Sequence, residues 1–454
     1  MERQDVPKSR PSGLPRRQVL VRGGLAAGGA VALALGMPAA TSPARAATED
    51  FDAEVPTAWF DLLTRLVRTT AGFSPPVVSR VCGYAGVALY ETVVSGSVGY
   101  RSLRSALDGL PPVPTADRLD WALAANAALA RLFRLLFTTT SDANLAAIDN
   151  LELIMARLSG TGPTGALFNA SVRHGRAVAE RVADWARGDG GHEGHLRNHP
   201  PGYILPTGPG LWVPTPTGYL PALQPTWGHS RCFVLATAAA CPPGSPTHYS
   251  EHASSPFHIE AREVYETVNN LTSDQSAIAW FWSDDPAATA TPPGHLIAIT
   301  TQILRAESAS LMAAAEAYAK VGMALADAFI ACWHAKYQHN LLRPVSYLNA
   351  HVDANWLPIL STPPFPEYPS GHSVQSGAAF HVLADLFGDM YPFDDHTHDE
   401  RGMSPRHFRS FAHAAEEAAI SRLYGGIHYR PAIEDGLFQG RCIGEAINAL
   451  PFKR

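Results

Sequence analysis

The chain has 454 residues, of which 46% are hydrophobic and 17% are charged. This composition excludes a disordered, collagen-like or coiled-coil protein, and the length is sufficient to bury a large core. Lysine and arginine together number 35 against 41 aspartates and glutamates, so the formal net charge is −6. The acidic excess argues against a nucleic-acid-binding protein that relies on phosphate contacts.

Residues 1–46 have the features of an export signal. They run from the pair Arg16-Arg17 through an uncharged Gly- and Ala-rich stretch, 23–40, to small residues around Ala46. This order predicts a twin-arginine signal peptide that is removed, and hence a periplasmic or extracellular protein. A transmembrane anchor is the alternative, but the apolar run is short and rich in glycine, so we expect no stable membrane anchor.

The sequence has five cysteines, at positions 82, 232, 241, 332 and 442. An odd number without CxxC spacing predicts neither a disulfide framework nor a zinc site. Cys232 and Cys241 are close enough in sequence for a local bridge in an oxidising compartment. Five buried thiols are the equal alternative.

Most of the chain after residue 46 predicts an all-α protein. Ala and Leu recur at helical spacing in 118–158, 169–187 and 305–338, and alternating β-branched runs are nearly absent. Prolines forbid regular helix between about 200 and 247, where tryptophans and tyrosines predict an ordered loop that packs across the molecule. We therefore expect an N-terminal helical region with a Pro-rich loop, 47–250, and a C-terminal helical region, 251–454.

The first polar segment of the C-terminal region runs from Lys336 to Pro344. Seven residues at about 100° each make nearly two helical turns, which places Lys336 and Arg343 on one face, about 10 Å apart along the axis. Pro344 is expected to end that helix. A cation pair of this kind is typical of a solvated surface, but the apolar residues 325–333 before it favour a buried pair that needs an anion.

The second polar segment is Pro369-Ser370-Gly371-His372, followed by an Ala-rich helix. A Ser-Gly pair that opens a helix presents free backbone N–H groups, a hydroxyl and the positive end of the helix dipole, which together suit an oxyanion. His372 is then placed to transfer protons to that oxyanion. The alternative is an ordinary serine N-cap next to an incidental histidine.

The third polar segment surrounds Arg422 and His428. A helix from about Ser404 is expected to stop at Gly425-Gly426, with Arg422 in its last turn and His428 just beyond it. Arginine offers a planar fork to an oxyanion. His428 fits a ligand, a nucleophile or a structural histidine.

Together, the three segments form the order KxxxxxxRP, PSGH and SRxxxxxH, separated by 24 and 48 residues. This order resembles the signature of the vanadium-dependent haloperoxidases and of the related type 2 phosphatidic acid phosphatases, which include bacterial acid phosphatases. Weaker similarity to haloperoxidases extends over 79–92, the surroundings of Trp227, and 281–294. The resemblance implies two packed helical bundles, with the anion site between helices of a catalytic C-terminal region.

The resemblance also implies a role for each signature residue, with vanadate as the cofactor. Lys336, Arg343 and Arg422 would neutralise its oxygens, Ser370 and the Gly371 amide would add hydrogen bonds, His428 would bond vanadium, and His372 would be the acid–base group. The implied reaction oxidises halide with hydrogen peroxide to hypohalous acid, while vanadium stays pentavalent. A dedicated acceptor, where one exists, would be a small organic molecule.

The phosphatase branch is the alternative, in which the same histidine attacks phosphorus. About 290 residues lie between the expected signal peptide and Lys336, whereas soluble acid phosphatases of this superfamily are shorter, so the length favours a haloperoxidase. Phe365 resembles an aromatic position near the halide side of some haloperoxidase sites, although ordinary packing would also explain it.

The sequence departs from the family pattern at Ala432, where many members have an aspartate four residues after the final histidine. Asp435 is a weak substitute for orienting His428. In the haloperoxidase-like stretch, Asp285 is a candidate partner for an active-site arginine, with Asp284 its equal on sequence alone.

A secreted metal-binding or structural protein is a hypothesis of another class. The clusters Asp394-Asp395-His396-Thr-His398-Asp399 and His192-Glu193-Gly-His195 contain residue types that bind divalent cations. Neither has a complete metal-site spacing, and solvated loops are the competing interpretation.

Overall fold

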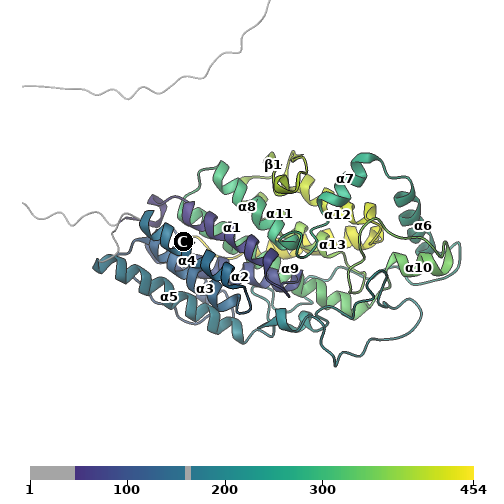
Figure 1. Cartoon of the computed structure of the whole chain (residues 1–454), viewed down its shortest axis with the longest axis horizontal. Coiled ribbons are helices and arrows are strands. Elements are labelled where there is room, and N and C mark those ends of the chain that lie inside the picture. The colour runs from purple at the N-terminus through teal and green to yellow at the C-terminus, as the bar shows by residue number, and fades with distance from the viewer. Residues whose placement is uncertain (1–45, 159–164) are drawn as a thin grey trace, which may run out of the picture. The chain divides into compact units, whose positions relative to one another are not determined.

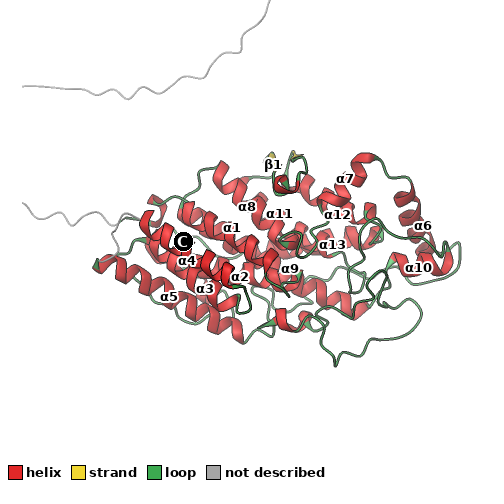
Figure 2. Ribbon diagram, viewed as in Figure 1, coloured by secondary structure: helices red, strands yellow, loops and turns green. Residues whose placement is uncertain are grey.

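Helices dominate the computed structural model, which describes residues 46–158 and 165–454 (Figures 1 and 2). In that part of the chain, 13 α-helices make the protein 58% helical, so the prediction of an all-α fold is confirmed. The predicted signal peptide lies outside the described residues, apart from Ala46. The helices are Glu54–Thr69 (α1), Pro75–Val93 (α2), Trp121–Leu136 (α3), Asp142–Leu158 (α4), Ala166–Arg187 (α5), Pro256–Asn269 (α6), Ser273–Phe281 (α7), Thr291–Ala306 (α8), Leu311–His339 (α9), Pro344–His351 (α10), Gly371–Phe387 (α11), Phe411–Tyr424 (α12) and Arg430–Asn448 (α13).

Helix α9 is the central element, because it packs against α2 on one side and against α11 and α13 on the other. Two glycines allow the α2 and α9 backbones to approach closely. A Cβ on Gly86 would lie 2.3 Å from the Tyr318 carbonyl oxygen, and one on Gly322 would lie 2.4 Å from the Cys82 carbonyl oxygen. Among the described residues, Pro75–Gly96 is the one helical stretch apolar and long enough to cross a membrane, and its apolar window is wholly buried inside the protein.

The Pro-rich segment crosses the helices as an ordered loop, which confirms that prediction (green in Figure 2). The buried carboxylate of Asp327 on α9 accepts hydrogen bonds from three successive loop amides, those of Phe233, Val234 and Leu235, at 2.6–2.9 Å. Buried backbone amides need such partners, because no water reaches them. The loop is therefore fixed to the helix that carries Lys336.

A disulfide joins the loop to the last helix, and it is not the bridge considered from the sequence. Cys241 pairs with Cys442 on α13, 201 residues away, whereas Cys232 is a buried free thiol. Both earlier alternatives, the local bridge and five free thiols, are wrong. Cys241 pairs with Cys442 because the loop packs against α13, although Cys232 is closer in the sequence.

Two predicted helix boundaries are also wrong. Helix α9 ends at His339, because Asn340 adopts a left-handed conformation with φ of 48°, and Arg343 is instead the N-cap of α10. The segment after Ser404 is not helical at first. It forms strand Arg406–Phe408 (β2), paired antiparallel with Phe393–Asp395 (β1), and α12 begins after the N-cap Ser410.

Candidate active site

The three polar segments converge from four places in the fold. Lys336 comes from the last turn of α9, Arg343 from the start of α10, Ser370 to His372 from the start of α11, and Arg422 and His428 from the end of α12 and the turn after it. Gly371, His372, Arg422 and His428 line a cavity of about 670 Å³. Lys336, Arg343 and Ser370 are fully buried behind that wall. The structure thus brings all seven predicted site residues together.

Lys336 organises the loop that leads into α11. Its ammonium donates to the carbonyl oxygens of Pro366, Glu367 and Pro369 at 3.0, 2.9 and 2.5 Å. Burial, with a smaller contribution from the positive charge of Arg343, lowers the pKa of this ammonium to about 7. A bound anion would restore the preference for the charged form.

Arg343 has one buried donor without a protein partner among the described residues. Its Nε donates to the Phe365 carbonyl at 3.0 Å, and its Nη1 lies 2.8 Å from the Ile427 carbonyl and 3.1 Å from His428 Nε2. Its buried Nη2 has no hydrogen-bond partner among the described residues. Buried guanidinium N–H groups are normally satisfied, so this one calls for an acceptor such as an oxyanion.

The partner of His428 is Glu367, which was not recognised from the sequence. His428 Nδ1 lies 2.7 Å from Glu367 Oε1, which also accepts the backbone N–H of Tyr429 at 3.0 Å. Arginine can only donate, so Arg343 Nη1 donates to His428 Nε2, and Nδ1 carries the proton that it donates to Glu367. Burial, and then the charge of Arg343, holds the pKa of His428 well below its ordinary value, which keeps the ring neutral. A fixed neutral imidazole is what a metal ligand requires, and Nε2, whose lone pair here accepts from Arg343, is the nitrogen that would serve as the ligand.

Asp435 does not orient His428, so that prediction is wrong. Its carboxylate accepts a hydrogen bond from the Tyr368 hydroxyl at 2.8 Å. Glu367 was visible in the sequence, next to the PSGH segment, but nothing in its spacing linked it to a histidine 61 positions away. Burial raises the pKa of Glu367 to about 7, while Arg343 and Lys336 oppose that shift.

The start of α11 has the predicted N-cap geometry. The Ser370 hydroxyl accepts the Ser373 N–H at 3.4 Å, and His372 lies in the first turn. The buried Nε2 of His372 has no hydrogen-bond partner in the described part of the chain. Burial, reinforced by the charge of Arg422, places its pKa well below the ordinary value, so His372 is a neutral base beside the cavity.

Arg422 completes the set of buried cations. Its Nε donates to the Ser421 hydroxyl at 2.9 Å and its Nη2 to the Ala279 carbonyl at 3.2 Å. Burial lowers its pKa to about 10, while the charges of Asp284 and Asp285 oppose that shift. In the described structure neither aspartate bonds to Arg422 directly. Asp285, which lines the cavity, is therefore an electrostatic neighbour of Arg422 and not an ion-paired partner.

Aromatic rings cover the cations on the cavity side. The Phe365 ring centroid lies 4.9 Å from Arg343 Cζ and 5.1 Å from Lys336 Nζ, and 4.9 Å from the ring of Trp333. Contacts of this type stabilise desolvated cations. Phe365 thus belongs to the cavity wall, as the sequence suggested, and Trp333 is a second wall residue that its helical spacing did not reveal.

The residues present fit a vanadate group. Three buried cations supply charge for its oxygens, the unpartnered Arg343 Nη2 supplies a hydrogen bond, and His428 Nε2 supplies a nitrogen ligand. Vanadate and phosphate are both tetrahedral oxyanions that need the same cations and hydrogen-bond donors, so the donor set by itself defines an oxyanion site.

The two clusters considered as cation sites from the sequence differ in the burial and contacts of their residues. His398 and Asp395 are buried, whereas His396 is exposed and bonded to Asp399 at 2.8 Å. In the other cluster, His195 stacks on Phe73 with ring centroids 5.0 Å apart. Among the described residues, the one group of three potential metal ligands contains His398, His295 and Asp284, and of these Asp284 also lines the cavity of the oxyanion site.

Comparisons with known proteins give the family. Residues 316–451 match the family described as the second helical-bundle domain of vanadium chloroperoxidase (VCPO). The vanadium chloroperoxidase of Curvularia inaequalis is 28% identical over 167 residues, and the match spans 26% of this chain and 27% of that protein.

Solved structures extend the similarity to nearly the whole chain. The crystal structure of a bacterial vanadium-dependent iodoperoxidase has 39% identity and a TM-score of 0.81, covering 89% of this chain and 97% of that one. A bacterial vanadium-dependent chloroperoxidase shares the fold at 16% identity, with a TM-score of 0.66, covering 85% of this chain and 93% of that one. With this identity over almost the full relative, and with the signature residues gathered at one buried oxyanion site, the chain belongs to the vanadium-dependent haloperoxidase family.

Proposed function

We propose that the protein binds vanadate and uses hydrogen peroxide to oxidise iodide to hypoiodous acid. The observation that carries this proposal is the buried relay of Glu367, His428 and Arg343: the neutral His428 is held by Glu367 at Nδ1 and by Arg343 Nη1 at Nε2, and the Nη2 of the same guanidinium has no partner among the described residues. Iodide is chosen among the halides because the 39% identical relative is an iodoperoxidase.

In this proposal each cation has a defined task. Lys336, Arg343 and Arg422 neutralise the oxyanion, and the Ser370 hydroxyl and Gly371 amide add hydrogen bonds at the positive end of α11. His428 Nε2 would be the nitrogen ligand of vanadium, and Glu367 would hold the His428 ring in place. When bound, vanadate supplies Lewis-acid activation of hydrogen peroxide.

His372 is the proposed acid–base residue. It lines the same cavity as His428, and its depressed pKa leaves it neutral and able to accept a proton from incoming hydrogen peroxide. The positive charge of Arg422 next to it favours prompt release of the proton.

We also propose that the protein acts outside the cytoplasm. The twin-arginine motif of residues 16–17 supports export, and the disulfide between Cys241 and Cys442 supports an oxidising compartment.

The test is an assay of the purified, chelator-treated protein with hydrogen peroxide and iodide, bromide or chloride, with and without added orthovanadate. Hydrolysis of p-nitrophenyl phosphate is followed in parallel. Iodide oxidation that requires vanadate supports the proposal. Phosphate release that vanadate inhibits, without halide oxidation, would assign the same oxyanion site to phosphatase chemistry.

A further inference from the structure

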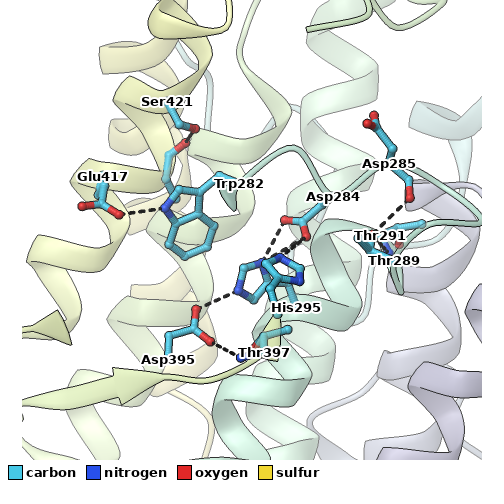
Figure 3. A network of polar contacts seen from close by, with 12 residues as sticks. Trp282, Asp284, Asp285, Thr289, Thr291, His295, Asp395, Thr397, Glu417 and Ser421 are labelled. Carbon is cyan, nitrogen blue, oxygen red and sulfur yellow. Dashed lines mark hydrogen bonds and ion pairs between the residues drawn. The ribbon is translucent and has the colours of Figure 1, made fainter. Parts of the chain in front are cut away.

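A second cavity, of about 520 Å³, shares Asp284 and Arg68 with the wall of the first. The buried residues Asp284, His295 and His398 all line it, and their donor atoms lie within 4.8 Å of one another. They come from three separate segments: the turn after α7, the helix α8, and the loop after β1. Figure 3 shows Asp284 and Asp395 on opposite sides of His295.

The separations between these donors match the edges of a metal coordination shell. Asp284 Oδ1 lies 3.1 Å from His295 Nδ1 and 3.4 Å from His398 Nε2. With metal–ligand bonds of about 2.1 Å, neighbouring donors lie about 3.0 Å apart in an octahedron and about 3.4 Å apart in a tetrahedron. Two imidazoles and one carboxylate are a common ligand set for divalent first-row transition metals.

The unpartnered nitrogen of His398 is the independent observation that points to a ligand. His398 is 2% exposed, and its Nε2 has no hydrogen-bond partner among the described residues, although it faces Asp284. A buried imidazole nitrogen without a partner is unfavourable unless something else binds it. A metal shared with Asp284 and His295 would satisfy it.

His295 also has the outer partner that metal-binding histidines usually have. Its Nε2 lies 2.8 Å from Asp395 Oδ2, and the other oxygen of Asp395 accepts the Thr397 N–H at 2.9 Å. A histidine that donates one ring N–H to a carboxylate presents the other nitrogen, here Nδ1, as a fixed and more basic ligand. The two buried carboxylates together balance a divalent cation.

We infer that Asp284, His295 and His398 form a binding site for a divalent transition-metal ion, distinct from the vanadate site. The metal takes His295 Nδ1, His398 Nε2 and one Asp284 oxygen, and the proton displaced from His295 Nδ1 leaves to solvent. The second cavity leaves room for water at the remaining coordination positions. Because Asp284 belongs to both cavity walls, the ion fixes the segment 283–286 that lines the active site.

The test uses zinc as the probe and the full chain without added vanadate. Chelator-treated wild-type protein is titrated with Zn²⁺ by calorimetry, and the bound metal is counted by mass spectrometry after gel filtration. His398→Gln removes one ligand. His396→Gln is the matched control, because His396 lies two residues away, is exposed, and its side chain bonds to Asp399, which is not one of the proposed ligands.

We expect one zinc per chain in the wild type and in His396→Gln, and at least 100-fold weaker binding in His398→Gln. Asp395→Asn is expected to weaken binding 10- to 100-fold, because it disturbs His295 without removing a ligand. If circular dichroism shows that His398→Gln does not fold, the zinc affinity of Asp395→Asn tests the proposed site instead. Co²⁺ in place of Zn²⁺ should give visible absorption in wild type only when Zn²⁺ is absent.

The inference is overturned if folded wild type binds no zinc stoichiometrically, or if folded His398→Gln or Asp395→Asn binds zinc as tightly as wild type does. The cluster would then be a buried imidazolium that joins two carboxylates. Vanadate-dependent iodide oxidation is measured separately on metal-free protein, so its failure concerns the proposed function and leaves the zinc result unaffected.

Discussion

Replacing His372 with alanine is expected to separate turnover from vanadate binding. His372 lines the cavity in the first turn of α11, and burial keeps its ring neutral at neutral pH. Loss of a general acid–base group slows catalysis about 10²- to 10⁴-fold. That range corresponds to about 2.7–5.4 kcal/mol in the activation barrier.

The effect on vanadate affinity is expected to be much smaller. The positive charge that attracts the anion comes from Lys336, Arg343 and Arg422, each of which is fully or almost fully buried, and the substitution leaves all three in place. A neutral imidazole contributes at most one ordinary hydrogen bond, of about 0.5–1.5 kcal/mol. The dissociation constant of vanadate should therefore rise no more than about tenfold.

The assay is triiodide formation at saturating vanadate, combined with a separate vanadate titration. His381→Ala is the control, because this histidine is half-buried on the same helix and faces Gly444 of α13 rather than the cavity. Turnover of His372→Ala within about threefold of the wild type would refute the assigned role. A vanadate affinity reduced by several orders of magnitude would show instead that His372 holds the anion.

Three further predictions concern the site and its support. His428→Ala is expected to abolish vanadate-dependent iodide oxidation, since it removes the proposed bond to vanadium, and retained activity in the same assay would contradict that role. Glu367→Ala is expected to weaken vanadate binding about 10- to 100-fold, because the His428 ring loses its Nδ1 partner. The control Asp435→Ala should bind vanadate like the wild type. An equilibrium titration in which Glu367→Ala binds vanadate as tightly as the wild type would contradict the role of Glu367. Cys442→Ser is expected to lower the free energy of unfolding by about 2–5 kcal/mol, because it opens a bridge between positions 201 residues apart. Thiol titration of the unreduced, denatured wild type should find only the three free cysteines. Five titrated thiols would show that the bridge is absent.

Features that depend on neighbours along the chain could be predicted from the sequence alone. Ser370 caps α11 as predicted because a serine hydroxyl accepts an N–H three residues ahead, and α12 stops at Gly425 and Gly426. Helical spacing of Ala and Leu gave the all-α class. The seven site residues were predicted because the order of the three polar segments resembles the haloperoxidase and phosphatase signature; each segment alone left an ordinary structural explanation open.

The groups that face one another across the core could not be predicted from the sequence. Glu367, and not Asp435, meets His428, Cys241 meets Cys442, and Asp284 lies between two histidines from other segments. Lys336 and Arg343 share the site although they do not share a helix, because α9 ends at Asn340 and the chain turns back. Buried charges and thiols take the partners that packing brings within reach, and packing depends on contacts between segments far apart in the chain.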